Sequence, residues 1–156
     1  MPVTRLKRFL DEHHVPYVTI IHSPAYTAQQ VAQATHIPGK ELAKSVMVWM
    51  DGEMTMAVVP ASYRVDLRQL AFAAGKKDCE LASERDFSHI FPGCELGAMP
   101  PFGNLWGVST YVSDTLAEDE RIAFSAGRHT EVMVLPYRDY QRLVEPRVLG
   151  FSRKVA

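Results

Sequence analysis

Residues 44–59 read KSVMVWMDGEMTMAVV, and this stretch predicts a β-hairpin. Two runs, Lys44–Met50 and Glu53–Val59, have the apolar and β-branched composition of strands. They are separated by Asp51-Gly52, a dipeptide typical of the two-residue turns that join antiparallel strands. We therefore expect a hairpin in the middle of the chain.

Weaker patterns on both sides of the hairpin predict the remaining elements. The first expected helix is capped by Thr4 and ended by residues 13–16, and the second runs from Thr27 to about Thr35 with a capping box to Gln30. The third covers Leu67–Ala74, between an Asp66 cap and Gly75. A short helix from Ser83 to near residues 91–93 and one over Tyr137–Val144 complete the set. The expected strands are Tyr17–Ile21, Gly107–Ser113, Arg121–Ser125 and Glu131–Leu135.

The order of these elements favours an α+β fold. Helices and strands interleave, but the central hairpin argues against a doubly wound parallel sheet. We expect a mixed, strongly curved sheet with helices packed around it. No internal repeat, linker or low-complexity segment interrupts residues 1–156, so the sequence predicts one domain.

Composition limits the classes of partner. The chain has 156 residues, with 17 Lys and Arg against 18 Asp and Glu, and a formal net charge of −1. This balance excludes a uniformly basic nucleic-acid coat and an acidic disordered tail, so any RNA must be bound by a local patch. A chain of this length can bury roughly 70% of the surface of its unfolded form.

The sequence also indicates a compartment. Apolar runs stay well short of the roughly 20 residues that span a bilayer. The first ten residues, MPVTRLKRFL, are amphipathic and lack the apolar segment of a signal peptide. Two cysteines, Cys79 and Cys94, make no disulfide framework and are expected to be ordinary half-buried thiols. We expect a reduced, cytoplasmic protein with no membrane partner.

Residues 97–103 read GAMPPFG and form the most unusual segment. Two prolines fix their own φ angles, while the flanking glycines permit backbone conformations that other residues resist. Such a stiff loop can hold backbone N–H groups in place, as an ester or amide hydrolase requires for a developing oxyanion. A rigid turn with no chemical role is the alternative interpretation.

Lys44 and Ser45 begin a run that otherwise has the composition of a buried strand. A lysine at the mouth of such a strand can hold a phosphate or carboxylate as a point charge, although an ordinary exposed lysine also explains the pattern. Ser45 lacks the Gly-x-Ser-x-Gly elbow of serine hydrolases, which excludes a serine-hydrolase triad.

Residues 125–130, SAGRHT, predict a turn between two strands, with His129 at a loop edge outside the core. There it can transfer a proton or bind a polar substrate, or it can be a plain exposed histidine. Neither the six histidines nor the two cysteines have metal-site spacing, and the glycines form no nucleotide fingerprint, so we expect no metal and no cofactor. The methionines of the predicted strands are expected to fill the core: Met47, Met50, Met54, Met56 and Met133.

Taken in order, several short segments resemble one known family. They are His22, Tyr26-Thr27, AKSV at 43–46, MAVVP at 56–60, the 97–103 loop, VSD at 112–114 and FSAGRH at 124–129. From about residue 5 to residue 150, the sequence resembles the YbaK family, also called the prolyl-tRNA synthetase-associated or INS-like aminoacyl-tRNA editing domain. The resemblance implies a mixed sheet of six to seven strands that curls into a partly open barrel flanked by helices.

The resemblance also implies an activity. It is that of a freestanding trans-editing enzyme that hydrolyses the ester of a mischarged aminoacyl-tRNA by attack of water, with help from the terminal ribose hydroxyl and without a metal. The family's lysine matches Lys44, and its Gly-x-x-x-Pro loop matches Gly97 to Pro101. Lys44, which would hold the phosphate of the 3′-terminal adenosine, Gly97 and His129 are thus expected to be catalytic. The expected substrate-binding residues are Tyr26, Thr27, Ser45, Ala98, Met99, Pro100, Pro101, Phe102, Gly103 and Gly127.

The implied partner is mischarged tRNA, held by its 3′ acceptor end, with an aminoacyl-tRNA synthetase as a second candidate and no DNA. Two alternatives stay open: a noncatalytic module that binds tRNA ends or synthetases through the same pocket, and a hydrolase of a small aminoacyl ester. The residues Pro100-Pro101-Phe102 and Arg128-His129 differ from the cysteinyl- and alanyl-specific branches, so the edited amino acid also stays open.

Overall fold

The centre of the molecule is the hairpin expected from the sequence, seen in a computed structural model that describes residues 2–155. Its strands are β2 (Leu42–Met50) and β3 (Glu53–Pro60), which pair antiparallel. Asp51 and Gly52 both have positive φ angles, 49° and 80°, as a type I′ turn requires. The hairpin prediction is confirmed.

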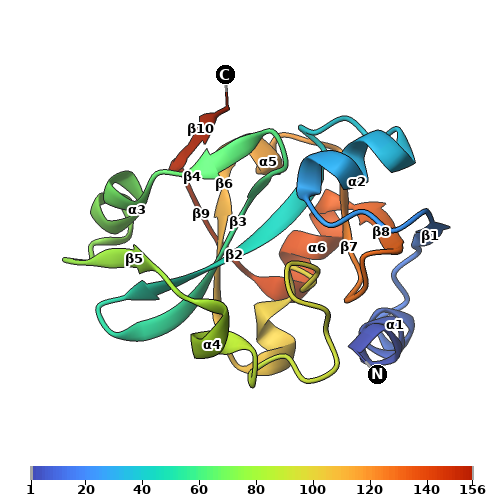
Figure 1. Ribbon diagram of the computed structural model, residues 1–156, viewed down its shortest axis with the longest axis horizontal. Helices are drawn as coiled ribbons and strands as arrows, with labels where there is room; N and C mark the ends of the chain where they lie inside the picture. The colour runs from blue at the N-terminus through green and yellow to red at the C-terminus, as the bar shows by residue number, and fades with distance from the viewer. Residues whose placement is uncertain (1, 156) are drawn as a thin grey trace.

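The other strands build on both sides of this hairpin: β1 (Val18–Ile21), β4 (Tyr63–Val65), β5 (Cys79–Leu81), β6 (Ser109–Ser113), β7 (Arg121–Ser125), β8 (Glu131–Pro136), β9 (Arg147–Leu149) and β10 (Ser152–Lys154). Eight strands form one sheet in the order β1-β8-β7-β2-β3-β6-β9, with β5 added to β2 (Figure 1). The β2–β7, β3–β6 and β6–β9 pairs are parallel and the others antiparallel. β4 and β10 form a separate antiparallel ribbon. This mixed, unclosed sheet confirms the expected fold class.

Six α-helices and one 3-10 helix connect the strands of residues 2–155: α1 (Pro2–Glu12), α2 (Ala28–Thr35), α3 (Leu67–Ala74), η1 (Gly103–Trp106), α4 (Glu84–Phe87), α5 (Asp114–Ala117) and α6 (Tyr137–Val144). The predicted capping box of Thr27 and Gln30 begins α2. Asp66 caps α3 by accepting the Gln69 N–H, and Gly75 ends it in a left-handed conformation. None of these helices is long and apolar enough to cross a lipid bilayer.

Several boundaries differ from the sequence-based expectations. Thr4 lies inside α1, which begins at Pro2, because a first helical turn accepts proline. α4 ends at Phe87, before the expected residues 91–93. Gly107, with a φ of 70°, ends η1, so β6 begins only at residue 109. Four strands were not predicted: β4, β5, β9 and β10. Each has three residues, which is too short to show the alternation of apolar and polar side chains that identifies a strand.

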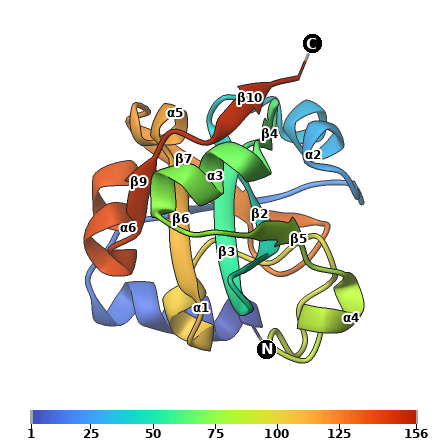
Figure 2. The same ribbon diagram turned by 90° about the vertical axis from the view of Figure 1, so that its left-hand side faces the viewer.

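Two of three hydrophobic clusters cover the two faces of the sheet at β3, and the third lies beneath α2. Met56 and Val58 of β3 point into the larger core beneath α1 and α6, whereas Ala57 and Val59 point into a smaller core beneath α3 (Figures 1 and 2). Burial on both faces explains why the hairpin sequence is apolar almost throughout. The strand methionines fill these cores as expected: Met47, Met50, Met56 and Met133 are buried, and Met54 packs against the larger core.

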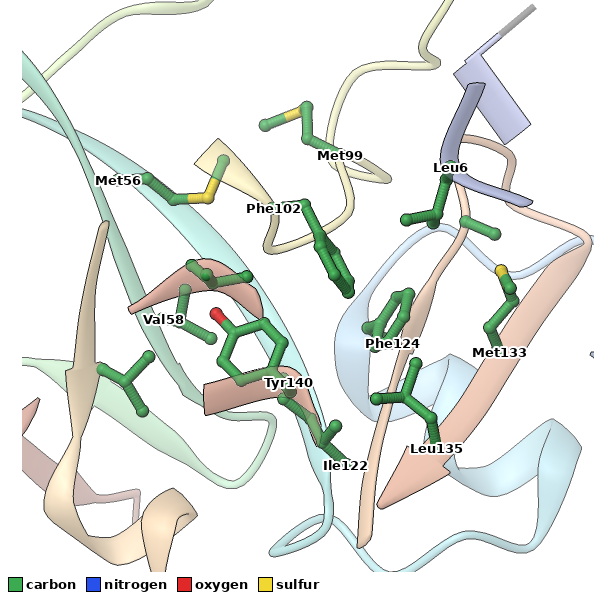
Figure 3. Packing of buried hydrophobic residues seen from close by; sticks show 14 of the residues in the cluster. Leu6, Met56, Val58, Met99, Phe102, Ile122, Phe124, Met133, Leu135 and Tyr140 are labelled. Atoms are coloured by element: carbon green, nitrogen blue, oxygen red, sulfur yellow. The ribbon is translucent and has the colours of Figure 1, made fainter. Parts of the chain in front are cut away.

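Phe102 lies at the centre of the larger core (Figure 3). Its ring centroid is 5.3 Å from that of Phe124 and 5.3 Å from that of Tyr140, which it meets edge-on at 89°. The loop that carries Phe102 is therefore fastened at this end by aromatic packing.

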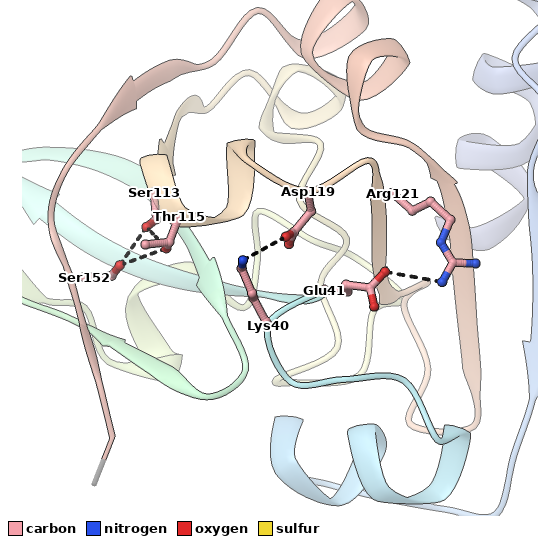
Figure 4. Close-up of polar contacts among 7 residues, drawn as sticks. All are labelled: Lys40, Glu41, Ser113, Thr115, Asp119, Arg121 and Ser152. Carbon is pink, nitrogen blue, oxygen red and sulfur yellow. Dashed lines mark hydrogen bonds and ion pairs between the residues drawn. The ribbon is translucent and has the colours of Figure 1, made fainter.

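A polar cluster joins the start of β2 to the segment before β7 (Figure 4). Lys40 Nζ lies 3.8 Å from Asp119 Oδ1, and Arg121 Nη2 lies 3.3 Å from Glu41 Oε1. The Asp119 side chain is only 8% exposed. Burial raises the pKa of its carboxyl to about 6, although the Lys40 ammonium opposes the shift. These contacts fix the place where β2 meets β7.

Candidate active site

The candidate site lies where β7 separates from β2. On this edge, β2 pairs with β7 only over its first two residues and with β5 only over its last three. Residues 44–47 face no strand there, and the 97–103 loop approaches this gap. The Ser45 hydroxyl donates a 2.9 Å hydrogen bond to the carbonyl oxygen of Met99. The loop is thus attached directly to the open strand edge.

Lys44 supplies a cation to this gap. It lies inside β2 and not at its mouth, because Leu42 and Ala43 before it already pair with β7. Its side chain is half-buried, and its Nζ donates to the carbonyl oxygen of Ala61 at 3.5 Å. Burial lowers the pKa of Lys44, since desolvation penalises the charged form. It forms no ion pair within residues 2–155, so its ammonium is available to an anionic ligand.

Gly97 lines the cavity with a left-handed backbone, at a φ of 86°. This conformation favours glycine, and a Cβ built there would lie 3.5 Å from Cε1 of His129. In the described part of the chain, the N–H groups of Gly97 and Met99 have no hydrogen-bond acceptor. Unpaired N–H donors beside a cavity are the groups that stabilise an oxyanion.

The rest of this loop is held by its backbone. The Ala98 N–H donates to Glu95 at 3.0 Å, and the Ala98 carbonyl accepts the Gly127 N–H at 2.8 Å. The Gly127 carbonyl in turn accepts the Glu95 N–H at 2.9 Å. Ala98 and Gly127 therefore fix the loop against the β7–β8 connection and do not line the cavity.

His129 lies in the predicted turn between β7 and β8, but the residue is only 8% exposed. The expectation of a loop-edge position outside the core is therefore corrected. The chain that leads into α2 covers the turn: the Ala25 N–H donates to the His129 carbonyl at 3.0 Å, and the Tyr26 ring lies 5.0 Å from the imidazole. On the cavity's outer side, His129 Nε2 lies 4.0 Å from Oε2 of the half-exposed Glu95.

Tyr26 and Thr27 form the outer rim of the cavity. Tyr26 is 67% exposed, so its ring presents one free face beside His129. The capping box fixes both residues, because Gln30 Oε1 accepts the Tyr26 and Thr27 N–H groups at 3.0 and 3.2 Å. The first turn of α2 thus gives the rim a defined shape.

The enclosed cavity is narrow, with a volume of about 20 Å³, room for about one water molecule. The hydroxyls of Thr27, Ser45 and Ser125 and the imidazole of His129 make part of its wall polar. It can therefore receive a small group with polar atoms next to the Lys44 cation. The full lining is Tyr26, Thr27, Ala28, Val31, Leu42, Ala43, Lys44, Ser45, Gly97, Met99, Ser125 and His129.

The structure thus brings together seven of the residues singled out from the sequence and leaves the others outside. The residues at the cavity are Tyr26, Thr27, Lys44, Ser45, Gly97, Met99 and His129. Pro100 and Pro101 are buried beyond it, and the Pro101 carbonyl accepts the Tyr140 hydroxyl at 2.6 Å. Phe102 is fully buried in the core, and a Cβ on Gly103 would collide with Thr110 Oγ1. The expected substrate contact of Phe102 and Gly103 is corrected: both support the loop.

Sequence reasoning missed five lining residues: Ala28, Val31, Leu42, Ala43 and Ser125. Ser125 had a signal, since it ends a predicted strand just before the turn with His129. Ala43 also had one, because it begins the AKSV segment at 43–46, whereas the patterns of Ala28, Val31 and Leu42 indicate only burial.

The thiols lie away from the cavity. Burial raises the pKa of Cys79 and of Cys94 to about 11, so both are protonated at neutral pH. Both are half-buried and unpaired, which confirms the expectation of ordinary thiols. Within residues 2–155, no group of three or more His, Cys, Asp and Glu side chains is placed to hold a metal ion.

Comparisons with known proteins agree with this architecture. The chain is 26% identical over 154 residues to the multifunctional Ser/Thr-tRNA deacylase ProXp-y of Escherichia coli, with 96% of this chain and 92% of the relative covered. It is 27% identical over 129 residues to the "Putative Cys-tRNA(Pro)/Cys-tRNA(Cys) deacylase EbsC" of Enterococcus faecalis, with 80% and 78% covered. A solved structure described as "a putative trans-editing enzyme for prolyl tRNA synthetase" superposes with a TM-score of 0.81 at 18% identity, covering 97% of each chain, and shows the fold alone.

The sequence profile of the aminoacyl-tRNA editing domain matches residues 22–143, a span that includes every residue lining the cavity. The resemblance noted from the sequence is thereby confirmed. The chain belongs to the aminoacyl-tRNA editing domain family.

Proposed function

We propose that this protein is a freestanding deacylase that hydrolyses the ester bond of a mischarged aminoacyl-tRNA. One observation carries the proposal: the Lys44 cation and the unpaired Gly97 N–H lie on one narrow cavity. A cation and fixed N–H donors are the two groups needed to bind a tRNA end and to stabilise negative charge on its ester. The 26% identical relative named as a deacylase supports the same activity.

The reaction needs little from the protein beyond position and charge. Water attacks the ester carbonyl carbon, and the carbonyl oxygen takes up negative charge. The bond to the ribose oxygen then breaks, one proton of the water passes to the ribose oxygen and the other to solvent, and the amino acid leaves as its carboxylate. An N–H donor aimed at such an oxygen contributes ~10²–10³ in rate. We assign this part to the backbone of Gly97 and Met99.

Lys44 and His129 have different parts in this proposal. Lys44 holds the phosphate of the 3′-terminal adenosine, and a phosphate would offset the burial that lowers its pKa. His129 contacts the aminoacyl group, and the Tyr26 ring and the Ala25 N–H, which donates to the His129 carbonyl, hold it in place. We assign stacking on the terminal base to the exposed face of Tyr26, which is 67% exposed.

The cavity also favours a class of amino acid. The hydroxyls of Thr27, Ser45 and Ser125 offer partners for a substrate hydroxyl. We therefore infer that serine and threonine esters are preferred over alanine and cysteine esters.

The remaining partners follow from the substrate. Mischarged tRNA is bound by its acceptor end, in the cytoplasm where charged tRNAs are made and used. A synthetase partner is not needed for the chemistry, because the cavity lies within this chain. We expect added prolyl-tRNA synthetase to change the tRNA supplied but not the rate of hydrolysis.

The test is deacylation of a panel of mischarged tRNAs carrying Ala, Ser, Thr or Cys. We expect turnover on the seryl or threonyl substrate and a loss of at least 100-fold for Lys44→Ala, the size of effect seen when a charge-stabilising group is removed. Lys154→Ala, an exposed lysine on β10 that lies outside the cavity, is the matched control and should keep activity. Binding of tRNA without turnover would replace the proposal with the noncatalytic module.

A further inference from the structure

Phe72 is the most exposed large hydrophobic side chain of residues 2–155, at 86%. It lies on α3, where its neighbours Leu70 and Ala74 already bury the inner face of the helix. The ring separates two open grooves, of about 530 and 470 Å³, and lines both of them. Neither groove belongs to the cavity described above.

The grooves on either side of Phe72 are lined by cations. Arg68 lines both, Lys76 and Lys77 line one, and Arg153 lines the other. Arg153 is held by Asp66 at 2.7 Å, whereas Arg68, Lys76 and Lys77 form no ion pair within the described residues. We call Phe72, Arg68, Lys76 and Lys77 the α3 platform.

Carboxylates near the α3 platform are largely engaged elsewhere. Asp66 accepts the Gln69 N–H as the α3 cap in addition to Arg153. The Asp51 carboxylate accepts the N–H groups of Lys77 and Asp78. Asp78 is the remaining acidic residue in the groove lining. Four cations, with Arg153 included, therefore face the three carboxylates of Asp51, Asp66 and Asp78, which leaves a local excess of one positive charge on a chain whose net charge is −1.

The chain connects the platform directly to the cavity. Ala61, whose carbonyl accepts Lys44 Nζ, is followed by β4 and then by α3. In both ribbon views β4 lies between α3 and α2 (Figures 1 and 2). β4 is paired with β10, which a 2.6 Å hydrogen bond between the Ser113 and Ser152 hydroxyls fixes to the sheet (Figure 4).

The length of this connection limits the distance between Phe72 and the cavity. Five extended residues followed by six helical ones place Phe72 at most about 25 Å from Ala61. At about 3.4 Å per stacked nucleotide, that distance corresponds to roughly seven nucleotides. The α3 platform therefore lies within reach of roughly the last seven nucleotides of a strand whose 3′ end enters the cavity.

We propose that the α3 platform binds the acceptor stem of the tRNA whose 3′ end occupies the cavity. The inference rests on the proposed function and adds a second contact to it. Arg68, Lys76 and Lys77 bind phosphates, and Phe72 stacks on a base at the junction of stem and unpaired end. A protein partner fits less well, because lysine is depleted at protein–protein interfaces and enriched where nucleic acids bind.

The first experiment compares two substrates of one enzyme: the best aminoacyl-tRNA and the same amino acid esterified to adenosine that keeps its 5′-phosphate, the group assigned to Lys44. Phe72→Ala should raise KM for the tRNA about tenfold and leave kcat unchanged. Neither constant should change for the adenosine ester, which is too short to reach α3. Ile21→Ala, at a side chain that is 71% exposed on β1, is the matched control and should affect neither substrate.

The second experiment measures the charge directly. Fluorescence anisotropy with uncharged tRNA should give a log Kd against log salt slope that falls by about 2 in Lys76→Gln/Lys77→Gln. Arg138→Gln, an exposed cation on α6, is the control and should keep the wild-type slope.

The outcomes separate the two proposals. Wild-type rates and salt slope in both platform variants would overturn the α3 platform and leave the deacylase intact. An equal loss on tRNA and on the adenosine ester would also overturn it, because the effect would then arise in the cavity. Platform-dependent tRNA binding by a protein that hydrolyses none of the substrates would support the platform and exclude the deacylase.

Discussion

Residues 97–99 and residues 100–103 belong to one loop but lie in different surroundings. Gly97 is exposed, has a left-handed backbone, and shares with Met99 the unpaired N–H groups beside the cavity. Residues 100–103 are all buried. Their packing against Phe124 and Tyr140 keeps the loop in place.

The contrast between these two halves explains how the site tolerates unsatisfied groups. Unpaired N–H donors and a positive φ cost free energy, and they persist only where the surroundings fix them. Here the fixing comes from Phe102 in the core and from the Tyr140 hydroxyl on Pro101. We expect changes in residues 97–99 to reduce activity and changes in residues 100–103 to reduce stability.

The largest effect should come from Phe102→Ala. Removing a fully buried aromatic ring from the core should lower the free energy of unfolding by ~3–5 kcal/mol. Urea denaturation measures the loss, and deacylation by the fraction that stays folded should fall much less than in Gly97→Ala. Phe102→Leu, which keeps part of the volume, should cost less. Unchanged stability with lost activity would show that residues 100–103 act in catalysis and do not serve mainly to stabilise the fold.

Gly97→Ala should act on the other half. An alanine at a φ of 86° is strained, so relaxation of the backbone should move the N–H donor out of position. We expect deacylation to fall by ~10²–10³-fold. Gly107→Ala is the matched control, because Gly107 also has a positive φ, 70°, with nothing within 4 Å of an added Cβ. Equal activity in the two variants would make residues 97–99 a simple turn.

Tyr140→Phe tests a smaller contribution to the stability of residues 100–103, a single hydrogen bond. The change removes the 2.6 Å hydrogen bond to the Pro101 carbonyl and leaves that buried oxygen unpaired. The cost should be ~1–2 kcal/mol in thermal or urea unfolding. Tyr137→Phe is the control, since its buried hydroxyl has no partner within residues 2–155, and should be neutral or stabilising. Equal destabilisation by both variants would show that the hydrogen bond from Tyr140 to Pro101 does not stabilise the loop.

The smallest effect should come from Cys94→Ser, just before the loop. The thiol is half-buried with a pKa of about 11, so it is no nucleophile at neutral pH and lies outside the cavity. Initial deacylation rates should match those of the unchanged protein, and Cys79→Ser should behave likewise. An inactive but folded serine variant would replace attack by water with covalent catalysis.

The sequence predicted the elements whose signals are local. The Asp51-Gly52 turn, the Thr27 capping box and the Asp66 cap are each determined by a few adjacent residues. The short strands β4, β5, β9 and β10 are not, since each depends on an edge supplied by a distant part of the chain.

The site was predicted in part for the same reason. Lys44, Gly97 and His129 could be named from their residue types and from the family resemblance, and the cavity brings them together. The burial of His129 depends on Ala25 and Tyr26, about one hundred residues earlier, so the local turn sequence wrongly predicts an exposed position. Likewise, GAMPPFG gives no sign that its second half enters the core.

The buried carboxyl of Asp119 makes folding a proton-uptake reaction. Its pKa of about 6 lies above the unfolded value of 3.8, so between these two pH values the folded chain binds more protons than the unfolded one. The contribution of Asp119 to stability therefore falls as pH rises through this window. Hydrogen bonds from backbone N–H groups lower the pKa of Asp51, Asp66 and Asp86, whose contributions are lost only as pH falls below 3.8. Raising the pH from 3.8 to about 6 therefore removes the contribution of Asp119, whereas lowering it below 3.8 removes those of Asp51, Asp66 and Asp86.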